Sequence, residues 1–573
     1  MKNRFIAILC ISILAAGIFI GCKKSFFETP PLGSGSGAQL NTKDGVTKLL
    51  LGAYSLLDQV GASDPYGVDW KSDVTNWFFG DIASGDAYKG DLDSDQSDLN
   101  FFETHKVTST NVMLTFKWQA LYDGASRCND VLRALVATTD MTDEEKTVVA
   151  AQARGLRGHY YFELKKIWNN VPFVDENATE SRLPNDRDIW PDIESDFSFA
   201  ADNLPETFSE KGRLNKWAAK CYLAKTYLFQ KKFAEAKTVL DEVVVSGKTT
   251  GDLAYGLEDC FRDAFDVEHE NGKESVFAVQ MAVSKSIEND YNGAWFWALN
   301  DYSCCNFFRP SRNLGNAYRT DASGLPLLDT WNQNPIKNDI GLRSADPFAP
   351  ETGSLDPRLD WTLGRRGIPY LDYGLWPGKD RRSPDTEDGG PYIAMKYTRT
   401  KAQEESFGAQ NSWAEGTTAY NYTIIRYADV LLWAAECEVE VGSLEKAREY
   451  VNMVRNRAKS SCQVTTDEGD PAANYLVNPY ESGFSDQEFA RKAVRFERRL
   501  ELALEGHRFY DLVRWGIAEP YINTYIDGEK AFRQLLQSAS FQSNKNEYLP
   551  IPESEIVNST IDGVKTLTQN QGY

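Results

Sequence analysis

One stretch of the N-terminal half has the residue types of a cation-binding loop. The stretch DLDSDQSD resembles a calcium loop in the spacing of its carboxylates, which belong to Asp91, Asp93, Asp95 and Asp98. Gln96 stands where such a loop needs a turn glycine, and Phe102 stands where it needs a bidentate glutamate. We therefore interpret the stretch as a solvated acidic loop, with calcium binding as the alternative.

Residues that could catalyse hydrolysis are present without the required spacing. The four histidines form no H-E-x-x-H and do not cluster: His105, His159, His269 and His507. No G-x-S-x-G occurs, and Gly247-Lys248-Thr249 is not a phosphate loop, because Glu242 stands where its first glycine is required. Carboxylates are too numerous for a glycosidase pair to be informative. We predict a non-enzyme with no cofactor or metal; a glycosidase on a helical frame is the alternative.

Tryptophans are concentrated in one irregular region. Residues 290–422 are rich in Gly, Pro, Asp and Asn, lack helical periodicity, and hold six of the fourteen tryptophans. Such rings stack on the apolar faces of sugars while nearby polar side chains bond the hydroxyls, or they simply hold an irregular region together. We predict oligosaccharide contacts here and in the loop after the first helix, from Trp77, Asp81, Asp86, Tyr88, Trp295, Trp297 and Trp331.

The N-terminus carries an export signal and a candidate lipidation site. An apolar run from Phe5 to Ile20 follows Lys2 and Arg4, and its length suits a signal-peptide core better than a membrane-spanning helix. The run ends at Gly21-Cys22, which resembles the bacterial lipobox, where the cysteine is acylated and becomes the mature N-terminus. A chance cysteine behind an ordinary signal peptide is the alternative. The Gly- and Pro-rich stretch that follows predicts a flexible tether.

Charge and cysteine content narrow the class of protein. With 83 acidic and 62 basic side chains the net charge is -21, which disfavours nucleic acid as a partner. No C-x-x-C occurs, and Cys221 and Cys437 lie on helical apolar stripes. Most cysteines are therefore predicted to be buried free thiols, and the adjacent Cys304 and Cys305 are the exception to watch.

Helices must position these candidate residues. Apolar residues recur at helical spacing over 190–204, and small residues form a stripe along a helix predicted over 148–168, whose partner is predicted over 110–136. Two further hairpins share one pattern. Counted from Ala224 and from Ala435, positions +9, +12, +16 and +19 are Phe233, Ala236, Leu240 and Val243, and Leu444, Ala447, Val451 and Val454. These offsets resemble tetratricopeptide helix pairs.

Longer sequence blocks carry a more specific resemblance. In the C-terminal half they are IRYADVLLWAAE at 425–436, VRNRA at 454–458, ERRLELALEGHR at 497–508 and DLVRW at 511–515. Elsewhere they are Trp118 and Tyr122 before NDVL at 129–132, GLRGHYYFEL at 155–164, LPIP at 549–552 and QNQGY at 569–573. Together these blocks resemble the signatures of the SusD/RagB family of outer-membrane nutrient-binding lipoproteins. Their repeated Arg and Glu are predicted to form ion pairs between helices.

The resemblance implies a mostly α-helical fold, in which tetratricopeptide-like helix pairs form a curved scaffold with a long irregular, aromatic-rich insertion. It also implies a lipid-anchored outer-membrane protein that faces the exterior and passes an oligosaccharide to a SusC-like TonB-dependent transporter. A peptide-binding RagB-like member and a scaffold without its own ligand are the alternatives. Gln571 replaces the family's Pro near the end of the chain. Lys23 and Lys24 stand where acidic residues often promote surface export, which leaves the membrane face open.

The expected organisation follows from these features. We predict a signal peptide over 1–21, a lipidated tether over 22–40, an N-terminal helical scaffold over 41–250, an irregular ligand-binding insertion over 251–422, a C-terminal helical scaffold over 423–515 and a tail packed on the scaffold over 516–573.

Overall fold

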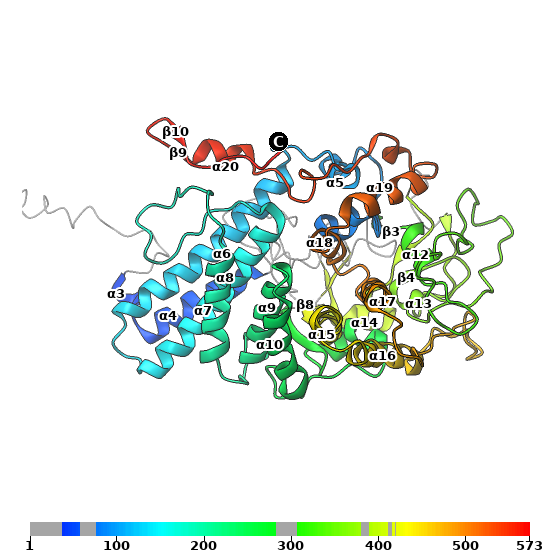
Figure 1. The fold of residues 1–573 in the computed structure, drawn as a ribbon, viewed down its shortest axis with the longest axis horizontal. Helices are drawn as coiled ribbons and strands as arrows, with labels where there is room; N and C mark the ends of the chain where they lie inside the picture. Colours follow the sequence, from blue (N-terminus) through cyan, green and yellow to red (C-terminus); the bar gives the residue numbers. More distant parts are fainter. Residues whose placement is uncertain (1–36, 58–75, 282–305, 380–388, 411–414, 419) are drawn as a thin grey trace, which may run out of the picture.

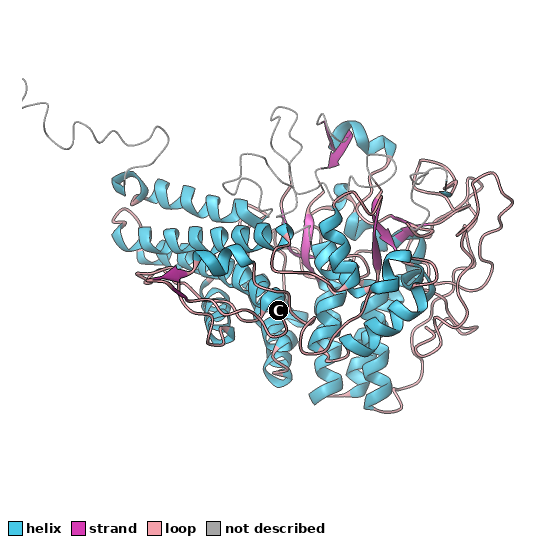
Figure 2. Cartoon of the chain, turned by 90° about the horizontal axis from the view of Figure 1, so that it is seen from above, coloured by secondary structure: helices cyan, strands magenta, loops and turns pink. Residues whose placement is uncertain are grey.

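A computed structural model describes residues 37–57, 76–281, 306–379, 389–410, 415–418 and 420–573. The predicted signal peptide lies outside the described residues, as do Cys22, Trp295, Trp297, Cys304 and Cys305. Within the described part the fold is mostly α-helical, as predicted, with short strands between the helices (Figures 1 and 2). No helix of the described part combines the length and apolar character needed to cross a membrane.

The helices fall into a long N-terminal series and a second series after the insertion. The first comprises α3 (Gly37–Leu40), α4 (Lys43–Tyr54), α5 (Asn100–Thr104), α6 (Val112–Ala137), α7 (Asp143–Trp168), α8 (Trp190–Asn203), α9 (Lys216–Phe229) and α10 (Phe233–Ser246). Short helices follow: α12 (Arg312–Ala317), α13 (Leu359–Thr362) and α14 (Lys401–Phe407). The second series comprises α15 (Tyr427–Val441), α16 (Leu444–Ser460), α17 (Gln487–Glu501), α18 (Arg508–Arg514), α19 (Ala518–Glu529) and α20 (Glu553–Asn558).

Local sequence signals explain where the scaffold helices begin. The Thr142 hydroxyl accepts the backbone N–H of Glu145, whose carboxylate accepts the N–H of Thr142, so a capping box starts α7. Pro191 occupies the first turn of α8, where its missing N–H costs nothing. Helices predicted over 110–136, 148–168 and 190–204 are therefore confirmed, and the capping box extends α7 to Asp143.

The two predicted hairpins stack against each other. α9 packs on α10, α10 packs on α15, and α15 packs on α16, so the helix series continues across the insertion (Figure 1). Phe233 and Leu444, at the edges of the hairpins, are partly buried. The inner positions of both copies are fully buried, and they are Ala236, Leu240, Val243, Ala447, Val451 and Val454. Each helix pair thus buries its apolar face on its neighbour, as a solenoid requires.

Short antiparallel ladders organise the segment between the two helix series. β2 (Ser275–Val279) pairs with β8 (Tyr422–Arg426), and this ladder brings the two ends of the insertion together. β1 (Ala87–Gly90) pairs with β3 (Phe307–Pro310), which fastens the insertion to the N-terminal part. The remaining ladders join β4 (Leu363–Gly364) to β5 (Ile393–Ala394), β6 (Gly408–Gln410) to β7 (Glu415–Thr418), and β9 (Thr560–Ile561) to β10 (Val564–Lys565).

Buried ion pairs lock the second helix series together, as predicted from the repeated Arg and Glu. Arg426, at the end of β8, contacts Glu501 and Glu505 at 2.6 and 2.8 Å. Arg455 of α16 contacts Glu497 of α17 at 2.8 Å. All these side chains are buried, so each charge is stabilised by its partner and not by water.

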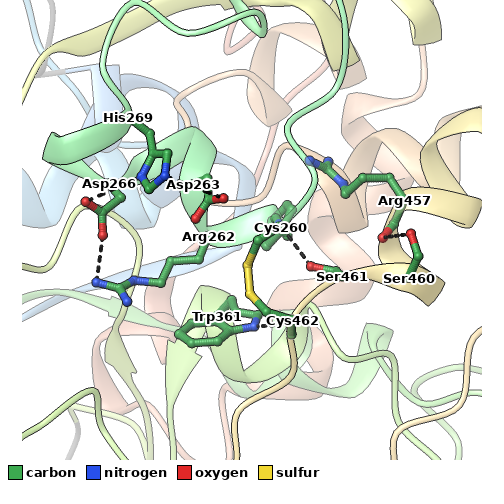
Figure 3. The surroundings of a disulfide bond; sticks show 11 residues. Cys260, Arg262, Asp263, Asp266, His269, Trp361, Arg457, Ser460, Ser461 and Cys462 are labelled. Atoms are coloured by element: carbon green, nitrogen blue, oxygen red, sulfur yellow. Dashed lines mark hydrogen bonds and ion pairs between the residues drawn. A yellow bond between two sulfur atoms is a disulfide. The ribbon is translucent and has the colours of Figure 1, made fainter.

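A disulfide links two segments that are far apart in the sequence. Cys260 is bonded to Cys462, which follows α16, although 202 positions separate them in the sequence (Figure 3). The Trp361 indole N–H donates to the carbonyl of Cys462 at 2.8 Å beside the bridge. Cys221 and Cys437 are buried free thiols, as predicted, and so is Cys128. The sequence showed no spacing that would have predicted the pair.

The C-terminal segment runs back along one edge of the molecule. After α19 it passes over the ends of α6 and α7 to reach α20 and the β9–β10 hairpin (Figure 1). The Trp168 indole N–H donates to the carbonyl of Pro550 at 3.0 Å, and the Asn570 amide donates to the carbonyl of Trp168 at 2.6 Å. The segment is thereby fastened to the end of α7.

Candidate ligand-binding surface

The structure places the predicted contact residues at two depths. Trp77, Asp81, Asp86 and Tyr88 are at most 3% exposed, so they offer no surface to a ligand in this conformation. Trp77 and Asp81 belong to a π-helical turn, Trp77–Ile82, that is buried throughout. Trp331 is half-buried and reaches the surface. We therefore build the candidate site on Trp331 and not on the four buried side chains.

The Asp81 and Asp86 carboxylates connect the N-terminal part of the chain to α17 and the loop after it. The Asp81 carboxylate accepts the N–H of Gly506 at 2.9 Å, which joins the N-terminal part to the loop after α17. Burial, followed by the charge of Asp86, raises the pKa of Asp81 well above its usual range. The Asp86 carboxylate instead accepts two hydrogen bonds from Arg499, at 2.7 and 3.0 Å.

Arg499 connects the buried Asp86 to the surface. Its guanidinium also donates to the side-chain oxygen of Asn313, in α12, at 2.7 Å. The same guanidinium lies 4.5 Å from the Trp331 ring centroid and 5.7 Å from that of Tyr521. Burial would lower the pKa of Arg499, but the charges of Asp86 and Tyr521 and the hydrogen bond to Asp86 together raise it. A permanently charged group therefore holds the Trp331 ring from behind.

A second buried cluster supports the neighbouring part of the surface. The Tyr88 hydroxyl donates to Glu529, at the end of α19, at 2.6 Å. Arg312, in α12, contacts the same carboxylate at 3.4 Å, and its guanidinium lies 3.6 Å from the ring centroid of Phe532. Burial raises the pKa of Glu529. Phe532 is 44% exposed, so its outer face is open to solvent.

These residues together form what we call the Trp331 surface, which consists of Trp331, Asn332, Tyr521 and Phe532. The Asn332 oxygen accepts a hydrogen bond from the Asn316 amide at 2.7 Å, which fixes the turn that carries Trp331. An aromatic ring on a charged support, followed in the chain by an exposed amide, can stack on a sugar ring and bond its hydroxyls, and the exposed Phe532 adds a second ring on a charged support. The arrangement contains no nucleophile with an adjacent base.

The sequence names Trp331 as a candidate contact and does not point to Tyr521 or Phe532. Tyr521 and Phe532 come from α19 and the turn after it, 190 and 201 residues after Trp331, in a segment predicted to be a tail. No local pattern joins them to Trp331. The block that contains Arg499 is the only sequence signal near this surface, because Arg499 contacts Trp331 as well as the scaffold.

The acidic loop is engaged by the protein itself. Asp93 pairs with Arg533 at 2.9 Å. Burial and the hydrogen bond and charge of Asp95 raise the pKa of Asp91 to about 6, although its hydrogen bond to the Leu92 backbone opposes this. Within the described ranges, no group of three or more His, Cys, Asp or Glu is arranged to hold a metal ion.

Comparison with known proteins identifies the family. The model of the SusD family matches residues 273–573, more than half of the chain, and a second model, described as starch-binding associating with outer membrane, matches residues 56–228. The chain belongs to the SusD family.

Curated members of the SusD family align over most of this chain. SusD-like protein P2 of Formosa agariphila is 26% identical over 483 residues, which is 81% of each chain. A SusD-like protein of Bacteroides ovatus is 24% identical over 552 residues, which is 90% of this chain and 83% of its own. Both alignments extend well beyond either family-model match.

Solved structures show the same fold. Surface glycan-binding protein A from Bacteroides thetaiotaomicron, in complex with laminarihexaose, gives a TM-score of 0.65 at 21% identity and covers 92% of this chain and 99% of its own. A laminarin-binding SusD-like protein gives 0.60 at 23% identity, over 93% of this chain and 100% of its own. The mostly α-helical scaffold of this SusD-family chain is thus shared with both structures.

Proposed function

We propose that this SusD-family protein binds an oligosaccharide at the Trp331 surface and is not an enzyme. The observation that carries the proposal is the Trp331 ring, half-exposed and fixed from behind by Arg499, with the exposed Asn332 following it in the chain. A rigid aromatic face loses little conformational entropy when a sugar ring stacks on it. The relatives named for glycan or laminarin binding support the same class of ligand. Trp295 and Trp297 remain further predicted contacts.

The test is calorimetric titration against neutral oligosaccharides, including laminarihexaose and maltohexaose, and against short peptides. We expect one or more oligosaccharides to bind and Trp331→Ala to weaken binding at least about tenfold, or about 1.4 kcal/mol. Trp361→Ala is the matched control, because Trp361 is also half-buried but lies beside the disulfide. Binding of peptides alone, or equal effects of the two substitutions, would contradict the proposal.

We further propose that Cys22 carries a lipid that anchors the protein to the outer membrane, and that the bound sugar passes to a SusC-like TonB-dependent transporter. The lipobox-like Gly21-Cys22 and the name of the second matching family support the anchor. The Cys260–Cys462 disulfide supports export, because such bonds persist in oxidising compartments. Cys22→Ser should abolish palmitate labelling and release the protein from the membrane fraction; unchanged labelling would exclude Cys22.

A further inference from the structure

A polar hollow lies away from the Trp331 surface, where the C-terminal segment crosses the end of α7. It has a volume of about 600 Å³, within the range of about 300–1,000 Å³ that is usual for small-molecule sites. Its walls come from the end of α7, the loop before α8 and the C-terminal segment. Its lining includes Lys165, Asn169, Asp186, Asp188, Trp190 and Thr568. We call it the Trp190 hollow.

The walls of the hollow are held by backbone-directed hydrogen bonds. The Asn185 amide donates to the carbonyls of Asn170 and Thr568 at 3.0 and 2.8 Å, and its oxygen accepts the N–H of Thr568 at 2.9 Å. Asn185 is itself buried, so its side chain holds the loop before α8 and the C-terminal segment in a fixed relation. Asn169 ends α7 with a positive φ of 59°, which turns the chain away from the helix axis at the rim. A site built this way needs little ordering when a ligand enters.

Trp190 supplies an aromatic wall. Its ring meets Phe162 edge-on at 5.7 Å between centroids and lies 6.2 Å from Phe229, so its inner side is packed. Trp190 is nevertheless only partly buried, because it stands at the first position of α8 and borders the hollow. The Lys165 ammonium lies 5.8 Å from the Trp190 ring centroid, so the hollow is lined by an indole held in place next to a cation.

The charges that line the hollow are balanced. Lys165 and Arg187 supply two positive charges, and Asp186 and Asp188 supply two negative ones. Lys165 pairs with Asp188 at 2.8 Å. Partial burial would raise the pKa of Asp188, but the hydrogen bond and charge of Lys165 lower it, so this carboxylate is ionised at neutral pH. Arg187 pairs with Asp192, so both cations of the lining are already paired and an anionic ligand would find no free positive partner among them.

We propose that the Trp190 hollow is a second saccharide site, which takes one end or one branch of a neutral oligosaccharide. A neutral polyol matches the lining, because an indole face receives the C–H side of a sugar ring while amides and paired charges bond its hydroxyls. The proposal rests on the proposed function for the class of ligand, but it uses a different set of residues. The Trp331 surface is built from the insertion, α19 and the turn after it, and the hollow from α7, the loop before α8, α8 and the end of the chain (Figure 1).

Two substitutions test the hollow without removing its supports. The Thr568 side chain is exposed, and its described bonds to Asn185 are made by the backbone, so Thr568→Trp should fill the hollow and leave the fold intact. Asp186→Ala removes one exposed carboxylate from the rim and unbalances the charge. Thermal unfolding within about two degrees of the unmodified protein would establish that both variants are folded.

The experiment is calorimetric titration of the full chain with laminarihexaose and maltohexaose, which counts sites as well as affinity. We expect about two equivalents of the better ligand for the unmodified protein, about one after Thr568→Trp, about one after Trp331→Ala, and none after both. Asp186→Ala should weaken the affinity of the ligand that binds in the Trp190 hollow several-fold.

Other outcomes separate the two proposals. One equivalent that Trp331→Ala removes and Thr568→Trp leaves unchanged overturns the hollow and keeps the proposed function. One equivalent that only Thr568→Trp removes keeps the hollow as the sugar site and overturns the Trp331 surface. No binding of either oligosaccharide to the unmodified protein overturns both.

Discussion

At the scale of single residues, Arg499 contacts both a buried carboxylate and a residue of the proposed binding surface. The guanidinium is bonded to the buried Asp86 on one side and lies against Trp331 on the other. A change at this position should therefore alter both the free energy of unfolding and the affinity for a ligand.

We expect Arg499→Met to lower the free energy of unfolding by about 3–5 kcal/mol, because it leaves the Asp86 carboxylate buried without its cation. Chemical denaturation measures the loss. Arg133→Met is the control, since Arg133 and its partner Asp130 are both exposed and such pairs contribute at most about 1 kcal/mol. Adding Asp86→Asn to Arg499→Met should recover part of the loss. Equal effects of the two methionine substitutions would show that the buried pair contributes nothing special.

The sequence predicts the buried ion pairs and the exposure of Trp331. It wrongly predicts that four other candidate contacts are exposed. Arg and Glu repeated at helical spacing can only be buried in pairs, which made the pairing readable from sequence. Trp77, Asp81, Asp86 and Tyr88 precede or adjoin a Gly- and Asp-rich loop, which suggested exposure. Their burial depends on partners such as Gly506, Arg499 and Glu529, more than 400 positions away. No local pattern reports such distant contacts.

At the scale of elements, close approach of helices limits what their glycines can become. A Cβ added at Gly124 in α6 would lie 2.5 Å from the ring of Tyr160 in α7. That ring is fully buried, and its hydroxyl donates to the carbonyl of Ala53 at 2.7 Å, so it has little freedom to move. A Cβ added at Gly52 in α4 would meet nothing within 4 Å.

We expect Gly124→Ala to destabilise the protein by about 1–3 kcal/mol through overpacking. Gly52→Ala should be neutral or stabilise by up to about 1 kcal/mol, because alanine is the better helix former. Melting temperatures of the two variants make the comparison. If Gly124→Ala melts no lower than Gly52→Ala, α6 and α7 do not pack as closely as described.

Helices were the elements that sequence predicted well. Their apolar stripes repeat every 3.6 residues, so α6, α7, α8 and both hairpins were located to within a few residues. The short ladders were not predicted. β1 with β3, for example, pairs segments that are more than 200 residues apart, and each strand is too short to show an alternating pattern.

At the scale of the whole molecule, buried carboxylates that join helices make stability depend on pH. Asp511 accepts from Arg498 and Arg514 at 3.0 and 2.8 Å. Burial would raise its pKa, but these two arginines lower it to about 2, from an ordinary value of 3.8. The folded state therefore binds the proton less tightly than the unfolded state, and the contribution is present above pH 4 and lost as the pH falls through 2.

We expect the contribution of Asp511 to be about 2 kcal/mol, lost between pH 4 and pH 2. Denaturation at intervals of half a pH unit measures it. Asp511→Asn should lower stability at pH 6 and show a shallower decline below pH 4. A decline as steep as that of the unmodified protein would assign the effect to other carboxylates.

The bridge between Cys260 and Cys462 turns the chain between them into a closed covalent ring. A protease that cuts the backbone once anywhere inside this ring, which includes much of the insertion, opens it without dividing the molecule in two. The scaffold on both sides of the cut stays on one piece, and the lipid that we propose on Cys22 would still hold that piece at the membrane. In denaturing gel electrophoresis, protein cut once between Cys260 and Cys462 should give one band before reduction of the disulfide and two bands after it.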